Sequence, residues 1–207
     1  MDVTSLAALE RYQFADLLHG LTKEQWEAPS LCGGWRVREV VAHVITYLDR
    51  SPAAFTIALL RHRLHLNRLN AADVHRCSAL QPSELIDNVR EHATPRGVGA
   101  GFGGRIALVE CMIHQQDIRR PLDLPRAIPA ERIRTALDFA KIAPLIRGGW
   151  YTRGFRLIAT DVNWSTGYGP EVRGPGEALL MTMARRPNAL SELSGPGVAV
   201  LNRRLRP

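Results

Sequence analysis

The sequence predicts a mainly α-helical protein that ends in a small α+β element. Apolar residues recur at the three- and four-residue spacing of a helix face through about the first 150 residues. After Gly148-Gly149 the pattern changes to short strand-like runs separated by turn-forming glycines and prolines. We therefore expect two domains, a helical bundle over residues 1–150 and a small α+β domain over residues 151–207.

The first predicted helix covers about residues 4–20, because apolar side chains recur there at helical spacing and Thr4 or Ser5 can cap its N-terminus. Thr22 then opens a short helical turn, which leads into a glycine-containing loop over residues 29–35. Tryptophans flank this loop at Trp26 and Trp35, a pattern that favours a loop packed onto the core over one that binds a ligand.

A second helix is predicted from about Val37, and its inward face is rich in valine. Ser51-Pro52 breaks or kinks it, because proline removes a backbone donor and disfavours helix in the residue before it. The helical pattern then continues from Phe55 to about residue 69, and residues 70–81 are polar and irregular. His62 and His65 lie among arginines on this stretch, which is typical of a solvated basic face.

Pro82 stands at the first turn of a third helix. Five glycines then occur between Gly97 and Gly104, but the Lys-Ser/Thr pair and the preceding strand of a phosphate-binding loop are missing. A flexible connection between helices is favoured there. A fourth helix is predicted from about Arg105 to Arg119, where Pro121 stops it, and a fifth over about residues 127–145.

The C-terminal quarter is predicted to contain two strands, over residues 155–160 and 171–173, joined by a turn-rich segment. An amphipathic helix follows from about residue 178 to 184. Apolar residues from Leu190 to Leu201 then predict a last helical turn and a terminal strand.

Composition excludes several classes of protein. The 207 residues are 45% hydrophobic, and no apolar run approaches the roughly 18 residues that span a bilayer. Met1-Asp2-Val3-Thr4 lacks the basic start of a signal peptide, so a cytoplasmic protein is expected. The 3 cysteines form no CxxC pair. The net charge of +7 comes from arginines spread along the chain rather than clustered in a nucleic-acid-binding motif, so nucleic acid is not the expected partner. Anionic small molecules are an alternative partner, but the charge alone does not decide between them.

The chemistry is predicted to centre on Glu110 and His114, which are four residues apart and so share one face of the fourth helix. Taken alone, the two could form a surface ion pair. His43 stands in the apolar second helix, where a histidine can also be a hydrogen-bonded core residue. Packed together, the three offer two nitrogens, one oxygen and an open position, the ligand set of a catalytic zinc site. Nickel or iron(II) could occupy the same set.

Two neighbouring residues bear on this interpretation. Cys111 points about 100° around the helix from Glu110, so it is poorly aligned to act as a nucleophile with His114. Asp117 follows His114 by three residues and could orient its imidazole. Alternatively, Asp117 caps the helix or pairs with Arg119 or Arg120.

Three segments resemble the mycothiol-dependent maleylpyruvate isomerase family, within the DinB/YfiT-like metal-binding four-helix bundles. The first runs from Trp26 through PSLCGGWRVREVVAH (residues 29–43), the second is VECMIHQQDIRRPL (residues 109–122), and the third covers residues 159–175. The resemblance implies a DinB-like four-helix bundle. It also implies a metal, usually zinc, held by His43, Glu110 and His114.

The same resemblance implies a low-molecular-weight thiol cofactor, mycothiol in actinobacteria. We therefore expect a metal-dependent enzyme that uses this thiol in isomerisation or S-transfer on a small electrophilic substrate, as a monomer or homodimer. The alternative is a non-catalytic metal-binding bundle with a structural, sensing or stress-related role.

Overall fold

The computed structural model describes residues 1–205, which form two compact units, Met1–Pro125 and a second unit that begins at Arg126. The prediction of a mainly helical chain with a small sheet near the C-terminus is confirmed. The first unit ends before α8 (Ala130–Ile142), whereas the sequence placed the boundary near residue 150. The difference arises because α8 packs against α9 (Gly148–Tyr151) and α10 (Gly176–Met183), which belong to the second unit.

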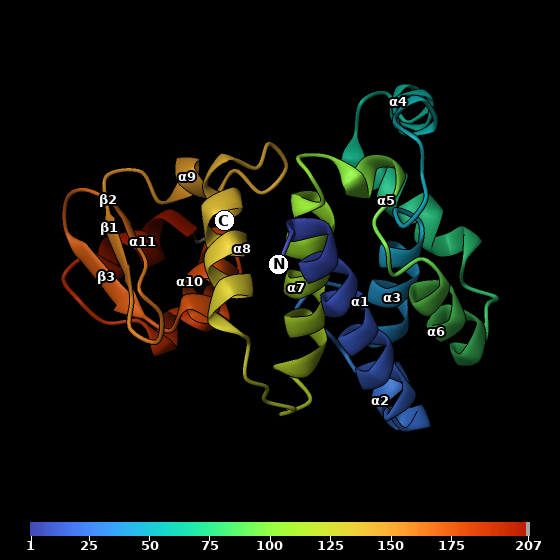
Figure 1. Ribbon diagram of the computed structural model, residues 1–207, viewed down its shortest axis with the longest axis horizontal. Coiled ribbons are helices and arrows are strands. Elements are labelled where there is room, and N and C mark those ends of the chain that lie inside the picture. The colour runs from blue at the N-terminus through green and yellow to red at the C-terminus, as the bar shows by residue number, and fades with distance from the viewer. Residues whose placement is uncertain (206–207) are drawn as a thin grey trace. The chain divides into compact units, whose positions relative to one another are not determined.

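The first unit contains the helices that carry the predicted site (Figure 1). α1 (Val3–His19) packs against both α6 (Pro82–Glu91) and α7 (Arg105–Arg119), and α3 (Val37–Ile45) packs against the same two helices. The short α2 (Lys23–Glu27) leads into the loop before α3. Apolar side chains from all five helices form one core, among them Phe14, Trp26, Val40, Val44, Leu85, Cys111 and Ile118.

The region between α3 and α6 differs from its prediction. Instead of one helix to about residue 69, the chain forms α4 (Pro52–Arg61) and α5 (Leu66–Arg76). They are separated by Arg63 and Leu64, whose φ angles of 54° and 61° are left-handed. The expectation that residues 70–81 are irregular is wrong for the first seven of them. The inward face of α5 includes Asp73, which is paired with Arg50 at 2.7 Å and Arg76 at 2.8 Å, so its sequence lacks an apolar stripe.

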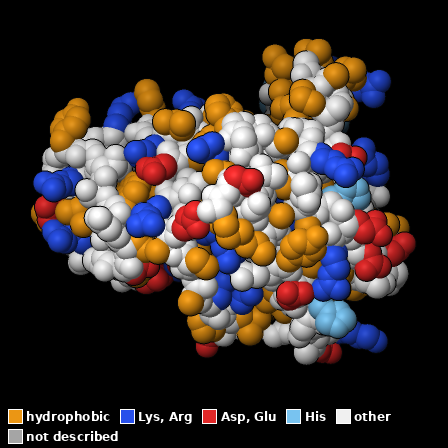
Figure 2. Space-filling view, viewed as in Figure 1, with side chains coloured by type: hydrophobic (Ala, Val, Ile, Leu, Met, Phe, Trp, Pro, Cys, Tyr) orange, Lys and Arg blue, Asp and Glu red, His pale blue; other side chains and the backbone are white. Residues whose placement is uncertain are grey.

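α4 is the most exposed helix of the first unit, and none of its residues is fully buried. Hydrophobic side chains gather on this projection at the upper right of Figure 2. They include Ile57, Leu60 and, just beyond the helix, Leu64. Among residues 1–205, no helix has both the length and the apolar character that crossing a bilayer requires.

The second unit is built on a three-stranded sheet of order β2-β1-β3. β1 (Arg156–Ala159) pairs antiparallel with β2 (Ser165–Gly167) and parallel with β3 (Glu171–Gly174). The sequence predicted β1 and β3 but not β2, which is three residues long and carries no large apolar side chain. After α10, the short 3₁₀ helix η2 (Pro187–Glu192) leads toward α11 (Val198–Leu205). The predicted terminal strand is therefore wrong: Leu201 and Leu205 lie one helical turn apart and are both buried.

Candidate metal centre

The structure brings together all three residues that the sequence proposed as metal ligands. His43 lies in α3, Glu110 and His114 lie one turn apart on α7, and the two helices pack side by side. One potential ligand atom from each residue lies within 4.8 Å of the other two. The imidazole rings of His43 and His114 have centroids 5.0 Å apart and are nearly perpendicular. Two nitrogens and one oxygen therefore converge at one point between α3 and α7.

The carboxylate of Glu110 gives an independent test of whether a cation fits there. Its Oε1 atom is shielded from solvent and has no hydrogen-bond partner among residues 1–205. Burial raises the pKa of Glu110, although the nearby positive charges of His114 and Arg11 oppose the rise. A buried carboxylate oxygen without a donor is costly. A divalent cation held by Glu110 would satisfy this oxygen, so the residues present fit a metal ion.

Arg11 contributes a second buried charge beside Glu110. This α1 residue is fully buried, and its Nη1 donates a hydrogen bond to the backbone oxygen of His92 at 2.9 Å. Its Nε and Nη2 have no hydrogen-bond acceptor within the described chain. The guanidinium favours the charged form of Glu110 without being hydrogen-bonded to it. Nothing in the sequence distinguished Arg11 from the other arginines.

Asp117 holds the imidazole of His114, one of the two roles that the sequence left open for it. The Nδ1 atom of His114 lies 3.0 Å from Oδ2 of the fully buried Asp117. Burial alone would lower the pKa of His114, but contacts with Asp117 and Cys32 raise it to about 10. The metal-free protein therefore holds a protonated His114 at neutral pH, and a cation that binds there must displace a proton. While Nδ1 is engaged by Asp117, Nε2 is the nitrogen available to a metal shared with His43 and Glu110.

Cys32 is a site residue that the sequence analysis did not single out. It lies in the loop between α2 and α3, where its Sγ donates to Oδ2 of Asp117 at 3.0 Å and lies 3.8 Å from Nδ1 of His114. The other cysteine near the site, Cys111, is fully buried in the hydrophobic core. A signal for Cys32 was present in the sequence, because it falls within the first family-like segment.

The loop that carries Cys32 is fixed by hydrogen bonds at several points. The backbone nitrogen of Leu31 donates to the backbone oxygen of Asp117 at 2.9 Å, which ties the loop to α7. Ser30 Oγ accepts from the Cys32 nitrogen at 3.1 Å and donates to the Trp35 oxygen at 2.8 Å. The position of Cys32 is therefore set by the backbone and not by the side chain alone.

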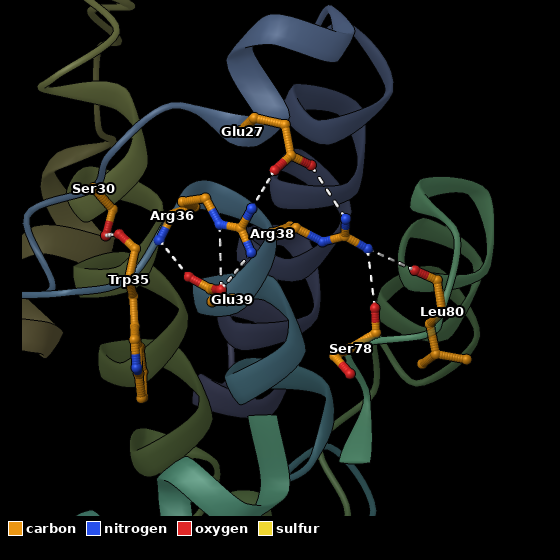
Figure 3. A network of polar contacts seen from close by, with 8 residues as sticks. All are labelled: Glu27, Ser30, Trp35, Arg36, Arg38, Glu39, Ser78 and Leu80. Carbon is orange, nitrogen blue, oxygen red and sulfur yellow. Dashed lines mark hydrogen bonds and ion pairs between the residues drawn. The ribbon is translucent and has the colours of Figure 1, made fainter. Parts of the chain in front are cut away.

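An ion-pair network fastens the end of the same loop to α2 and α3 (Figure 3). Arg36 contacts Glu27 at 2.6 Å and Glu39 at 2.7 Å, while Arg38 contacts Glu27 at 3.1 Å. Arg38 also donates to the backbone oxygens of Ser78 and Leu80, both at 3.2 Å. The network fixes the start of α3, two turns before His43.

Two aromatic residues enclose His43. The rings of Trp35 and Tyr47 each have centroids 5.2 Å from the His43 ring, and His43 is only 8% exposed. Tyr47 donates from its hydroxyl to Oδ1 of Asn70 at 2.6 Å, and burial is the main cause of its raised pKa. The phenol therefore stays neutral. Trp35 was expected only to pack its loop onto the core, and its contact with His43 makes it part of the site wall.

Residues 7–96 match the family model for the mycothiol maleylpyruvate isomerase N-terminal domain. This part of the chain, less than half of its length, is therefore similar to the N-terminal domain of mycothiol-dependent maleylpyruvate isomerases. The match contains the first family-like segment, including Cys32 and His43. The segments that carry Glu110 and His114, and the one over residues 159–175, lie outside it.

Two solved structures are similar to this chain in fold. Both are of the mycothiol-dependent maleylpyruvate isomerase, and one is a histidine-to-alanine variant. They are 13% and 14% identical to this chain, with a TM-score of 0.54 in each case. Each match covers 94% of this chain and 91% of the other, so the likeness in fold extends through both units. A comparison with curated proteins finds no match.

Proposed function

We propose that this protein is a metal-dependent enzyme that uses a low-molecular-weight thiol, mycothiol, in isomerisation or S-transfer on a small electrophilic substrate. The convergence of His43, Glu110 and His114 within 4.8 Å carries the proposal. The family of the N-terminal domain and the similar solved structures support the choice of thiol. Two histidines and one carboxylate leave a coordination position open, which is typical of catalytic rather than structural zinc.

His43, Glu110 and His114 would hold the cation, with zinc the first choice and nickel or iron(II) as alternatives. When bound, the cation would supply a Lewis acid that lowers the pKa of a thiol or water at its open position. Glu110 would contribute the negative charge that offsets part of the cation's own.

The residues around the three ligands would orient them and shield them from water. Asp117 keeps the Nδ1 proton of His114 in a hydrogen bond, which would fix the ring and leave Nε2 for the metal. Trp35 and Tyr47 cover the faces of His43 and exclude water from it. A dry surround strengthens the electrostatic interactions among the ligands.

The alternative is a non-catalytic protein in which the metal has a structural or sensing role. The two differ in the coordination shell: a catalytic centre exchanges a solvent or thiol ligand, whereas a structural centre is closed by protein groups.

Metal content and thiol chemistry test the proposal in sequence. His43→Ala and His114→Ala variants should contain less bound metal than the wild type by elemental analysis, whereas the exposed control His19→Ala should contain as much. Full metal content in both site variants would refute the three-ligand centre. The metal-loaded protein should then convert a small electrophile only when mycothiol is present, either to its isomer with the thiol regenerated or to a mycothiol adduct, and stripping the metal should abolish this activity. Metal binding without any thiol-dependent conversion of the electrophile would favour the non-catalytic alternative.

A further inference from the structure

We propose that Cys32, His114 and Asp117 form a second cation site, suited to a thiophilic divalent ion and distinct from the set made with His43 and Glu110. One potential ligand atom from each of the three lies within 4.8 Å of the others. The sulfur of Cys32 supplies a soft ligand that the first set lacks. His114 belongs to both sets, and Nδ1 is its atom that lies near Cys32 and Asp117.

The spacing of the three atoms matches the spacing of ligands around a tetrahedral ion. Zinc bonds of roughly 2.0–2.3 Å at tetrahedral angles place neighbouring ligand atoms about 3.3–3.6 Å apart. Here Sγ lies 3.8 Å from Nδ1 and 3.0 Å from Oδ2, and Nδ1 lies 3.0 Å from Oδ2. These distances bracket that range, so an ion can enter with shifts of a few tenths of an ångström.

The backbone holds the three ligands in place without an ion. His114 and Asp117 are three residues apart on α7 and share a face of the helix. The loop hydrogen bond from Leu31 to Asp117 and the contact between Ser30 and the Cys32 nitrogen fix the third ligand. A pre-arranged ligand set lowers the conformational cost of binding a metal.

The chemistry of the set favours a soft ion. A thiolate selects thiophilic ions such as Cd²⁺ and Zn²⁺ over hard ions such as Mg²⁺ and Ca²⁺. Binding replaces the Sγ proton of Cys32 and the Nδ1 proton of His114 by bonds to the metal, and both protons pass to solvent. Cys32 is only partly buried, so water can reach the set and complete the coordination shell.

Cadmium reports directly on this site, because a cadmium–thiolate bond has an ultraviolet charge-transfer absorption that nitrogen and oxygen ligands do not give. The test uses a His43→Ala/Glu110→Gln variant of the full chain, which keeps Cys32, His114 and Asp117. Titrated with Cd²⁺, this variant should bind one ion and show the sulfur–cadmium band. Adding Cys32→Ser should abolish the band and weaken Cd²⁺ binding at least about tenfold, because the soft ligand is lost.

Cys77→Ser in the same background is the matched control, since Cys77 is also a partly buried free thiol. It should leave both the band and the affinity unchanged. The proposal is overturned if the double variant shows no band, or if the band persists without Cys32. His43→Ala alone is the second background should the double variant not fold, and the same two cysteine substitutions decide the result there. Failure of the first set (His43, Glu110 and His114) to bind metal would not by itself remove the sulfur–cadmium band or make it persist without Cys32. The two proposals can therefore fail separately.

Discussion

Nδ1 of His114 and Oδ2 of Asp117 lie 3.0 Å apart on the same face of α7, in the unit Met1–Pro125. The contact joins a proposed metal ligand to a carboxylate that is fully buried. The contact fixes both the orientation and the tautomer of the His114 ring. The affinity of His43, Glu110 and His114 for a metal should therefore depend on Asp117, although Asp117 is not one of these three ligands.

Asp117→Asn should therefore weaken metal binding without removing a ligand of that set. We expect a loss of about 10–100-fold in affinity, the usual effect of changing the partner of a metal-bound histidine. The measurement is a competition titration against a chelating dye. Asp87→Asn, at an exposed position of α6, is the control and should bind as the wild type does. Equal affinities in both variants would show that Asp117 has no orienting role.

Glu110→Gln should have opposite effects on the metal-free and metal-loaded proteins. Without metal, the substitution removes a buried carboxylate whose pKa is raised by burial, so the variant should be as stable as the wild type or more so, by up to about 1–3 kcal/mol. With metal, the wild type should gain more stability than the variant, which has lost one ligand of the first set. Thermal unfolding with zinc and with a chelator measures both. A variant that zinc stabilises as strongly as the wild type would contradict Glu110 as a ligand.

The ion pair of Arg36 and Glu39 should make stability depend on pH in the acidic range. Hydrogen bonds from Arg36 lower the pKa of Glu39 below its ordinary value of 4.5. The stabilisation is therefore complete above that value and is lost as the pH falls through the lowered pKa. Because Arg36 is half exposed, Glu39→Gln should cost only about 0.3–1 kcal/mol at pH 7.

Urea unfolding at neutral and strongly acidic pH checks this expectation. The difference between Glu39→Gln and wild type should shrink as the pH falls, while the exposed control Glu91→Gln should differ little at either pH. A difference that stays constant with pH would mean that the ion pair contributes nothing.

Gly97→Ala should destabilise the first unit strongly. Gly97 has a φ of +52°, and a Cβ atom built there would overlap the backbone carbonyl of Arg50. Neither backbone can yield easily, because the nitrogen of Val98 donates to that same carbonyl at 2.8 Å. We expect a loss of at least about 1–3 kcal/mol by chemical unfolding. Gly33→Ala is the matched control, since no atom lies within 4 Å of its added methyl group. Equal stability of the two variants would contradict this account.

The sequence predicted a helix most accurately where the apolar residues had helical spacing and a proline marked the end of the same segment. α7 occupies the predicted residues 105–119, because its apolar face is continuous and Pro121 ends it. The spacing of Glu110 and His114 on that helix placed both on one face, and the valines of α3 made His43 an inward neighbour. Local pattern alone left a surface ion pair and a core histidine as alternatives, and the resemblance of the flanking segments favoured the three residues as one set.

The remaining parts of the fold and site depend on contacts between distant residues. Asp73 lies on the inward face of α5 because it forms an ion pair with Arg50. A search for the periodicity of apolar residues cannot detect a helix whose inward face carries a charged side chain. Cys32 lies 85 positions from the carboxylate it contacts, and only folding of the loop onto α7 brings them together. At the C-terminus, β-branched Val198 and Val200 favoured a strand, but the burial of Leu201 and Leu205 on one face selects a helix.

Both proposed cation sets draw every ligand from residues 32–117, within the unit that ends at Pro125. A gene segment that encodes the chain up to Pro125 would carry all of the proposed ligand residues. The segment that encodes the rest of the chain would carry none of them. Sequence drift after Pro125 can therefore proceed without altering any of these five ligand residues. A lineage could retain the metal chemistry while the rest of the coding sequence is replaced.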